Sequence, residues 1–352
     1  GVNLLLRGST IHKILPGSTK KISFIKIVFF GLDQAGKTSL IQFIKKKEPL
    51  TVLKEFLPST RPTVGVDYQK IEFQEIPIIL QELGGQKSLR ESHLQNLASY
   101  FKDCHIGVFV VDSTDILRFI EALNFFKRVN QKLDEINYNI PIKIAVHKAD
   151  TGISDANEII NELIYSLSME LNISLIDLMN NVYVTSIKNM SSISSFFSSI
   201  IEEILPIRSY ITNGLSTLIS LYPLDYCCLI DPELSRIPLG WVSKLDNLDP
   251  RTLINHILEY TEQVISELDV KKPLKLKESR YTIKISNYIK ELIYLPIFLE
   301  NGKKEYYFVF SYSEDWESYV TADMPPLDSL VKRALDPQLE LALLAIKSQE
   351  RI

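Results

Sequence analysis

The chain has 352 residues, of which 45% are hydrophobic and 23% charged, a composition typical of a folded protein large enough for two domains. Its formal net charge is −4, so no overall basic charge indicates nucleic-acid binding. Cys104, the adjacent pair Cys227 and Cys228, and five scattered histidines favour neither a disulfide framework nor a zinc site. No apolar run has the length of a membrane span. We therefore expect a reducing, cytoplasmic setting.

Residues 1–21 carry four basic side chains and no acidic one. Leu4, Ile11 and Leu15 would share one helical face, and a short basic amphipathic helix can contact a membrane surface. The run Gly8-Ser-Thr10 weakens this helix prediction. We favour a partly ordered extension, with a peripheral position at a membrane as the alternative.

An Ile-, Phe- and Val-rich segment of strand length, Lys21 to Phe30, precedes the run Gly31-Leu-Asp-Gln-Ala-Gly-Lys-Thr38. This run fits the phosphate-binding pattern G-x-x-x-x-G-K-[ST], and a helical pattern follows it. A strand, glycine loop and helix turn backbone N–H groups and the positive end of the helix dipole toward a polyphosphate. Lys37 is expected to neutralise the β- and γ-phosphates, and the Thr38 hydroxyl to hold Mg²⁺. The predicted phosphate-binding set is Gly31, Asp33, Gln34, Ala35, Gly36, Lys37, Thr38 and Ser39.

A loop-like stretch at residues 59–65 contains Thr63 and precedes an alternating strand pattern at residues 66–73. A threonine in such a loop is often only a turn residue. In a nucleotide switch it closes over Mg²⁺ and the γ-phosphate, and the loop relaxes on hydrolysis. Thr63 is therefore a candidate metal and catalytic residue.

The apolar strand predicted at residues 76–80 leads into Gln81-Glu-Leu-Gly-Gly-Gln86. An acid at a strand end can hold a Mg²⁺-bound water, which assigns that role to Glu82. The N–H of Gly85 can contact the γ-phosphate, and Gln86 can orient the attacking water. Alone, this segment is a moderate indication of a nucleotide switch, and its distance after the phosphate-binding loop makes the indication strong.

Further strands are predicted at residues 107–112, 142–146 and 181–184, with a helix at residues 116–133. The strand at 107–112 is a continuous apolar run, which is typical of a parallel sheet that is covered on both faces. The expected fold of the first domain is a doubly wound α/β sheet with the ligand at the carboxyl ends of the strands.

His147-Lys-Ala-Asp150 follows the strand at 142–146. The Asp150 carboxylate can accept from both N1–H and the exocyclic amine of guanine, a donor pair that adenine lacks. The aliphatic stem of Lys148 would lie along the base. The alternative role for Asp150 is a helix N-cap or a turn acid. After the last strand, a backbone N–H at Ser186 or Ile187 would meet the guanine O6.

This order of elements resembles the Ras-like small GTPases over about residues 22–205. The runs at 31–38, 62–65 and 84–86 resemble the Arf family, and those at 147–150 and 185–187 resemble the Rag (Gtr) family. The resemblance implies that Gly36, Lys37 and Thr38 bind phosphate and Mg²⁺. It also implies that Thr63 and residues 82–86 are switch elements and that Lys148 and Asp150 hold guanine.

Two residues depart from the usual family pattern. Glu82 stands where relatives have Asp, and its extra methylene shifts the carboxylate, whereas Mg²⁺ demands near-octahedral geometry. Metal affinity or hydrolysis can suffer from this shift, although Glu82 keeps its assignment as a metal ligand through water. His147 replaces the Asn that braces the phosphate loop in most relatives. Rag proteins carry His at this position, so nucleotide binding is expected to be intact.

Residues 206–352 are predicted to form a second, α+β domain. A helix at 209–221, two strands, a helix from Pro250, three strands and helical segments from Leu327, broken near Pro337, follow one another. This order is similar to the roadblock or longin-like domains of Rag proteins, which implies a homo- or heterodimer. No glycine loop, paired carboxylates or nucleophile constellation is present in the sequence of this domain.

The sequence as a whole thus predicts a GTP-binding switch that hydrolyses GTP slowly to GDP with Mg²⁺ and responds to activating and exchange proteins. The alternative is a hydrolysis-poor scaffold that acts as a Rag-like dimer. A P-loop ATPase or kinase is a poor third reading, because it leaves the run from His147 to Asp150 unexplained.

Overall fold

The computed structural model describes residues 24–45, 65–73, 76–150, 161, 164–169, 174, 178, 180–205, 207–231, 237–245, 254, 257–258, 279–285, 288–299, 304–314 and 324–348. They form two compact units, and the division falls between Phe196 and Phe197, inside helix α8 (Met190–Ile204). The predicted domain limits at residues 22 and 205 stay predictions. No described helix has the length and apolarity needed to cross a membrane.

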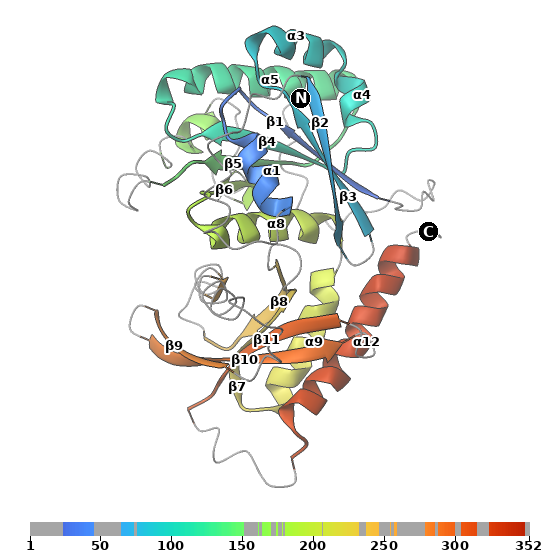
Figure 1. The fold of residues 1–352 in the computed structure, drawn as a ribbon, viewed down its shortest axis with the longest axis vertical. Helices are drawn as coiled ribbons and strands as arrows, with labels where there is room; N and C mark the ends of the chain where they lie inside the picture. The colour runs from blue at the N-terminus through green and yellow to red at the C-terminus, as the bar shows by residue number, and fades with distance from the viewer. Residues whose placement is uncertain are drawn as a thin grey trace, which may run out of the picture. The chain divides into compact units, whose positions relative to one another are not determined.

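The first unit is built on a six-stranded sheet with the order β2-β3-β1-β4-β5-β6 (Figure 1). Its strands are β1 (Ile25–Phe30), β2 (Val66–Phe73), β3 (Ile76–Leu83), β4 (Ile106–Asp112), β5 (Ile142–His147) and β6 (Val182–Val184). All neighbours are parallel except the pair β2 and β3. This sheet confirms the predicted α/β fold with a mostly parallel sheet.

Helices cover both faces of this sheet, with α1 (Lys37–Lys45) on one face and α5 (Phe119–Glu135) on the other (Figure 1). Under α5, the rings of Phe109 and Phe126 lie 4.6 Å apart between centroids, and Phe30 stacks on Phe126. Each fully buried side chain of this size stabilises the fold by roughly 2 kcal/mol. The core thus fixes the strand ends from which the site loops emerge.

Two helices that sequence patterns did not predict, α3 (Lys87–Gln95) and α4 (Leu97–Phe101), pack on the same face as α5. The predicted helix at 116–133 begins instead as a single 3₁₀ turn, Ile116–Arg118, before α5. The carboxylate of Asp115 caps this turn by accepting from the Arg118 N–H. Such short 3₁₀ turns are common at helix N-termini.

The second unit contains a five-stranded antiparallel sheet with the order β8-β7-β11-β10-β9. Its elements are α9 (Ile207–Leu221), β7 (Leu224–Asp231), β8 (Ile237–Ser243), β9 (Ser279–Ile285), β10 (Tyr288–Leu299), β11 (Lys304–Tyr312) and α12 (Leu327–Ser348). The described elements follow the predicted order, while most of the helix predicted from Pro250 lies outside the described residues. Likeness to a roadblock domain stays a prediction.

The adjacent cysteines show how both faces of this sheet are covered. Cys227 faces α9, where its Sγ lies 3.8 Å from the Leu215 carbonyl oxygen, whereas Cys228 belongs to an apolar cluster with Ile254 and Ile257. Successive strand residues point to opposite faces, so the two buried thiols serve separate cores.

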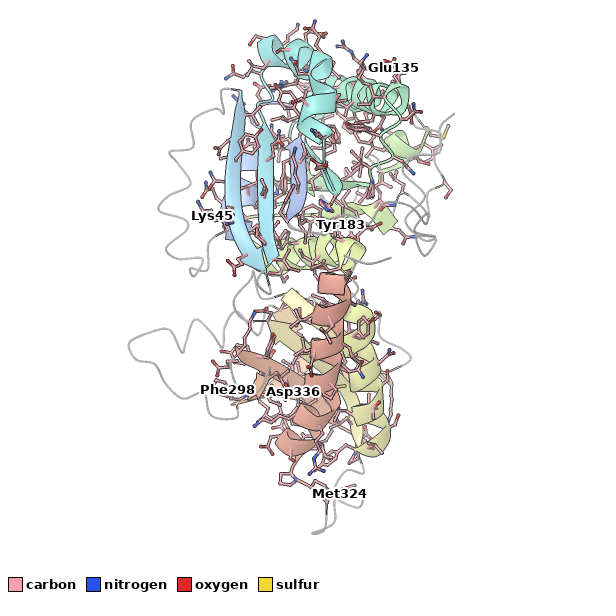
Figure 2. The ribbon with its side chains drawn as sticks, turned by 90° about the vertical axis from the view of Figure 1, so that its right-hand side faces the viewer. Lys45, Glu135, Tyr183, Phe298, Met324 and Asp336 are labelled. Carbon is pink, nitrogen blue, oxygen red and sulfur yellow. The ribbon has the colours of Figure 1, made fainter. Side chains whose placement is uncertain are left out.

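Helix α12 corrects the predicted break near Pro337, because it is continuous through this proline and lies beside α9 (Figure 2). Proline in a helix interior removes one hydrogen bond and costs about 3 kcal/mol. Val331, Leu335 and Leu339 lie at helical spacing on both sides of it and are fully buried. Their burial offsets the cost of the proline. A prediction from the local sequence could not include this burial, because it depends on packing against other elements.

Candidate functional site

The phosphate-binding pattern forms the turn between β1 and α1, and its backbone needs glycine at two points. Gly31 has φ +144° and Gly36 φ +92°, a region that side chains with Cβ rarely adopt. A Cβ on Gly31 would come within 2.3 Å of the Val110 carbonyl oxygen. The loop therefore passes directly over the carboxyl end of β4.

Lys37 lies inside this loop and is 4% exposed. Its Nζ donates to the carbonyl oxygens of Gly31, at 3.2 Å, and Leu32, at 2.7 Å. Burial lowers the pKa of Lys37 to about 8, against the opposing charges of Glu82 and Asp33. The ammonium group is thus held at the centre of the loop by oxygen atoms.

Thr38 and Glu82 meet beside the loop, one from the start of α1 and the other from the end of β3. The Thr38 Oγ1 lies 2.8 and 2.9 Å from the two oxygens of the Glu82 carboxylate, to which it donates. Glu82 is 4% exposed. A hydroxyl and a carboxylate are hard oxygen ligands of the kind that Mg²⁺ prefers, so this pair fits a magnesium ion.

The segment after β3 lies against the phosphate-binding loop. The Asp33 N–H donates to the Gly85 carbonyl oxygen at 3.0 Å, and the Gly84 N–H donates to the Gly65 carbonyl oxygen at 2.8 Å. A Cβ on Gly85 would come within 2.2 Å of the Asp33 nitrogen. Gln86 occupies the N-cap position of α3, where its backbone carbonyl oxygen accepts from the Leu89 N–H. The predicted residue Thr63 lies outside the described residues.

His147 links three parts of the site from the end of β5. It is 1% exposed, and its Nδ1 lies 2.9 Å from the Thr185 Oγ1. On the other side, a Cβ on Gly36 would come within 2.3 Å of the His147 Cδ2. The ring therefore packs against the phosphate-binding loop. Burial, helped by the charge of Lys148, lowers the pKa of His147 to about 4, so the ring is neutral near pH 7.

The predicted base-binding residues come together in the loops after β5 and β6. Ser186 Oγ donates to the Asp150 Oδ1, and the Lys188 Nζ lies 3.3 Å from the Asp150 Oδ2. The Ser186 N–H donates to the Ser192 Oγ at 3.1 Å, so this N–H is engaged by a side chain of α8. Ile187, the other residue predicted to face the guanine O6, follows Ser186 in the same loop.

Lys148 has φ +64°, a left-handed conformation that costs a non-glycine residue energy. Its Nζ lies 2.6 Å from the Asp112 Oδ2 at the end of β4. Burial opposes ionisation of Asp112, but the hydrogen bonds from Lys148 and Thr114 outweigh it and hold the pKa of Asp112 below its usual value. This ion pair orients the lysine whose stem is predicted to lie along the base.

A family model described as the Gtr1/RagA G protein conserved region matches residues 26–264, which is more than half of the chain. The chain belongs to the Gtr1/RagA G-protein family. It is therefore a guanine-nucleotide-binding protein, a small GTP-binding switch of the Arf/Rag type.

Curated relatives of this G protein include ADP-ribosylation factor-like protein 3 of Saccharomyces cerevisiae, 31% identical over 147 residues, which are 40% of this chain and 70% of that protein. ADP-ribosylation factor F of Dictyostelium discoideum is 29% identical over 126 residues, 36% of this chain and 60% of its own. A solved structure of the Arl6 BBS3 small GTPase from Trypanosoma brucei, with bound nucleotide analogue GppNp, is 21% identical with a TM-score of 0.38. The match covers 51% of this chain and 95% of the solved one.

Three contacts of the site in this G protein were missed by sequence reasoning. Lys188 pairs with Asp150, Asp112 pairs with Lys148, and Arg118 pairs with the loop residue Asp33 at 2.5 Å. Asp112 could have been found, because the carboxyl ends of parallel strands meet at one edge of a sheet. The Arg118 contact joins residues 85 positions apart, and no local pattern marks it.

We expect the buried His147 to make this G protein sensitive to acid. The folded state keeps the ring neutral down to about pH 4, whereas the unfolded chain protonates it below about pH 6.5. Between these values the unfolded state binds more protons, so stability falls as the pH falls. His147→Asn should remove about 2 kcal/mol of the stability loss between pH 7.5 and 5. Urea unfolding at both pH values measures the free energy of unfolding. An equal loss of stability in the wild type and in His147→Asn would contradict the prediction.

Proposed function

We propose that this G protein binds GTP and GDP with Mg²⁺ at the carboxyl edge of the six-stranded sheet and hydrolyses GTP slowly. The observation that carries the proposal is the convergence of Lys37, Thr38, Glu82 and Gly85 on one glycine loop. Switch segments that respond to the γ-phosphate would then signal to partners.

In this proposal each group around the loop has one role. The Lys37 ammonium neutralises the β- and γ-phosphates, and the Thr38 hydroxyl holds Mg²⁺, which would supply charge neutralisation at the phosphates. Glu82 holds a metal-bound water, and Thr63 closes over the metal. Gln86 orients the attacking water.

The base is proposed to lie between the loops after β5 and β6. The Asp150 carboxylate accepts from N1–H and the exocyclic amine of guanine, and the stem of Lys148 covers the ring. Of the two predicted backbone groups, the Ile187 N–H would face the guanine O6, because the Ser186 N–H donates to the Ser192 Oγ. The contact of Ser186 with Asp150 supports this assignment, because it brings the two base-reading segments together.

The scaffold alternative is favoured by one observation, the direct bond of Thr38 to both oxygens of Glu82. A longer acid that already reaches the threonine competes with Mg²⁺ for the same hydroxyl. Nucleotide would then stabilise a dimer with little turnover.

We also propose that the second unit is a roadblock/longin-like module through which the protein forms a homo- or heterodimer. Its five-stranded sheet ends in β8 and β9, and edge strands are suited to pairing. Activating and exchange proteins are further proposed partners, and so is a membrane surface for residues 1–21, which lie outside the described residues.

Single-turnover hydrolysis of bound GTP at saturating Mg²⁺ separates the two functions. For the wild type, a rate on the order of 10⁻⁴ to 10⁻³ per second matches an unassisted site of this type. We expect Glu82→Asp to raise the hydrolysis rate by about 10-fold, because the shorter acid frees the hydroxyl of Thr38 for the metal. ATP is the nucleotide control, and Glu91→Asp on the exposed face of α3 is the matched variant. Stable GTP binding without turnover in the wild type and in Glu82→Asp would favour the scaffold.

A further inference from the structure

A chain of ion pairs leads from the phosphate-binding loop to α3. The Asp33 Oδ1 lies 2.5 Å from Arg118, the Arg118 Nε lies 3.1 Å from Glu121, and the other oxygen of Glu121 lies 2.7 Å from Arg90. Arg118 ends the 3₁₀ turn before α5, and Glu121 lies in the first turn of α5. The roles proposed above leave the side chains of Arg118, Glu121 and Arg90 without an assignment, and Asp33 has only its place in the predicted phosphate-binding set.

Asp33 brings a negative charge to a loop that is built to hold phosphate. It lies between Gly31 and Lys37, and its own N–H is bonded to Gly85. Burial opposes ionisation of Asp33, but the hydrogen bond and charge of Arg118 outweigh it and lower the pKa of this carboxyl. Asp33 is therefore an anion near pH 7, and an unpaired anion here would repel a bound polyphosphate.

Arg118 is held so that it neutralises this anion. Its side chain is 31% exposed, close to the 30% of Asp33, so the pair is screened by solvent only in part. Glu121 bonds to the Nε of Arg118 and accepts from Arg90, whose guanidinium lies 5.8 Å from the Phe125 ring centroid. The guanidinium of Arg118 is thus fixed on two sides before any ligand arrives.

We propose that Arg118 is a positioning residue that draws the Asp33 carboxylate to itself and thereby sets the preference of the loop for GTP over GDP. GTP carries more negative charge than GDP, and the added charge is on the γ-phosphate. A free Asp33 carboxylate therefore opposes GTP more strongly than GDP. This inference rests on the proposed function of the loop as a guanine-nucleotide site.

The test measures the dissociation constants of fluorescent GTP and GDP analogues with Mg²⁺ for the full chain. We expect Arg118→Gln to lower the ratio of GTP to GDP affinity by about 10-fold, and Arg118→Lys to keep most of the ratio because it keeps the charge. Adding Asp33→Asn to Arg118→Gln removes the repelling carboxylate and should restore the ratio. The effect of Arg118→Gln should also shrink in 0.5 M salt, since screening weakens charge repulsion.

Arg128→Gln is the matched control, because Arg128 lies on α5 and pairs with Glu91 of α3, away from the ion pairs that lead to Asp33. This variant should leave the ratio unchanged, and thermal unfolding checks that every variant is folded. An unchanged ratio in folded Arg118→Gln, or no recovery in the double variant, overturns the inference while the proposed function stands. Wild-type protein that binds neither nucleotide would overturn both.

Discussion

Lys37→Ala is expected to abolish tight GTP binding, with a dissociation constant raised at least about 1000-fold, equivalent to roughly 4 kcal/mol. The Nζ of Lys37 is buried at the centre of the loop, bonded to the carbonyl oxygens of Gly31 and Leu32. A charge-assisted contact to phosphate in such a buried place is far stronger than one on the surface. No neutral side chain can replace that charge.

Titration with a fluorescent GTP analogue measures this effect, and thermal unfolding of the variant shows whether the fold survives. Lys45→Ala is the matched control on the same helix, because Lys45 is exposed at its end and bonds to Gln69 of β2 (Figure 2). We expect this control to bind GTP as the wild type does. Undiminished affinity in Lys37→Ala would refute the assignment of the loop to phosphate.

The first sheet could be predicted from sequence because its central strands are continuous apolar runs. Strands β1, β4 and β5 are almost wholly buried, and burial on both faces leaves an unmistakable pattern. Helix α12 shows the opposite case, since the local signal of Pro337 predicted a break. The packing of Leu335 and Leu339 decided the outcome, and packing against another element is not a local property.

The candidate site divides in the same way. Residues 31–38 could be assigned from the sequence because the loop is contiguous and its glycines serve its own backbone. Arg118 could not, since it reaches the loop from the 3₁₀ turn before α5, whereas His147 was placed beside the loop only by the resemblance to Rag proteins. The Arg118 side chain would be an ordinary surface residue in a different fold, so only the three-dimensional arrangement gives it a role.

Asp150→Asn is expected to weaken GTP binding by about 100-fold and to remove most of the preference for GTP over ATP. The carboxylate of Asp150 offers two acceptors, held by Ser186 on one oxygen and Lys188 on the other. An amide keeps one acceptor and adds a donor, so it faces one of the two guanine donors with a like group. A site built on hydrogen bonds discriminates strongly against such a mismatch.

The same change should improve binding of xanthosine triphosphate, because the new amide N–H₂ can donate to the oxygen at C2 of xanthine. Competition of GTP, ATP and xanthosine triphosphate for one fluorescent analogue measures all three affinities, with Asp134→Asn on the exposed face of α5 as the control. A gain for xanthine cannot come from unfolding, so it isolates the base-reading role. A variant with the wild-type ratio of GTP to ATP affinity would show that Asp150 only joins the loops after β5 and β6 through its contact with Ser186.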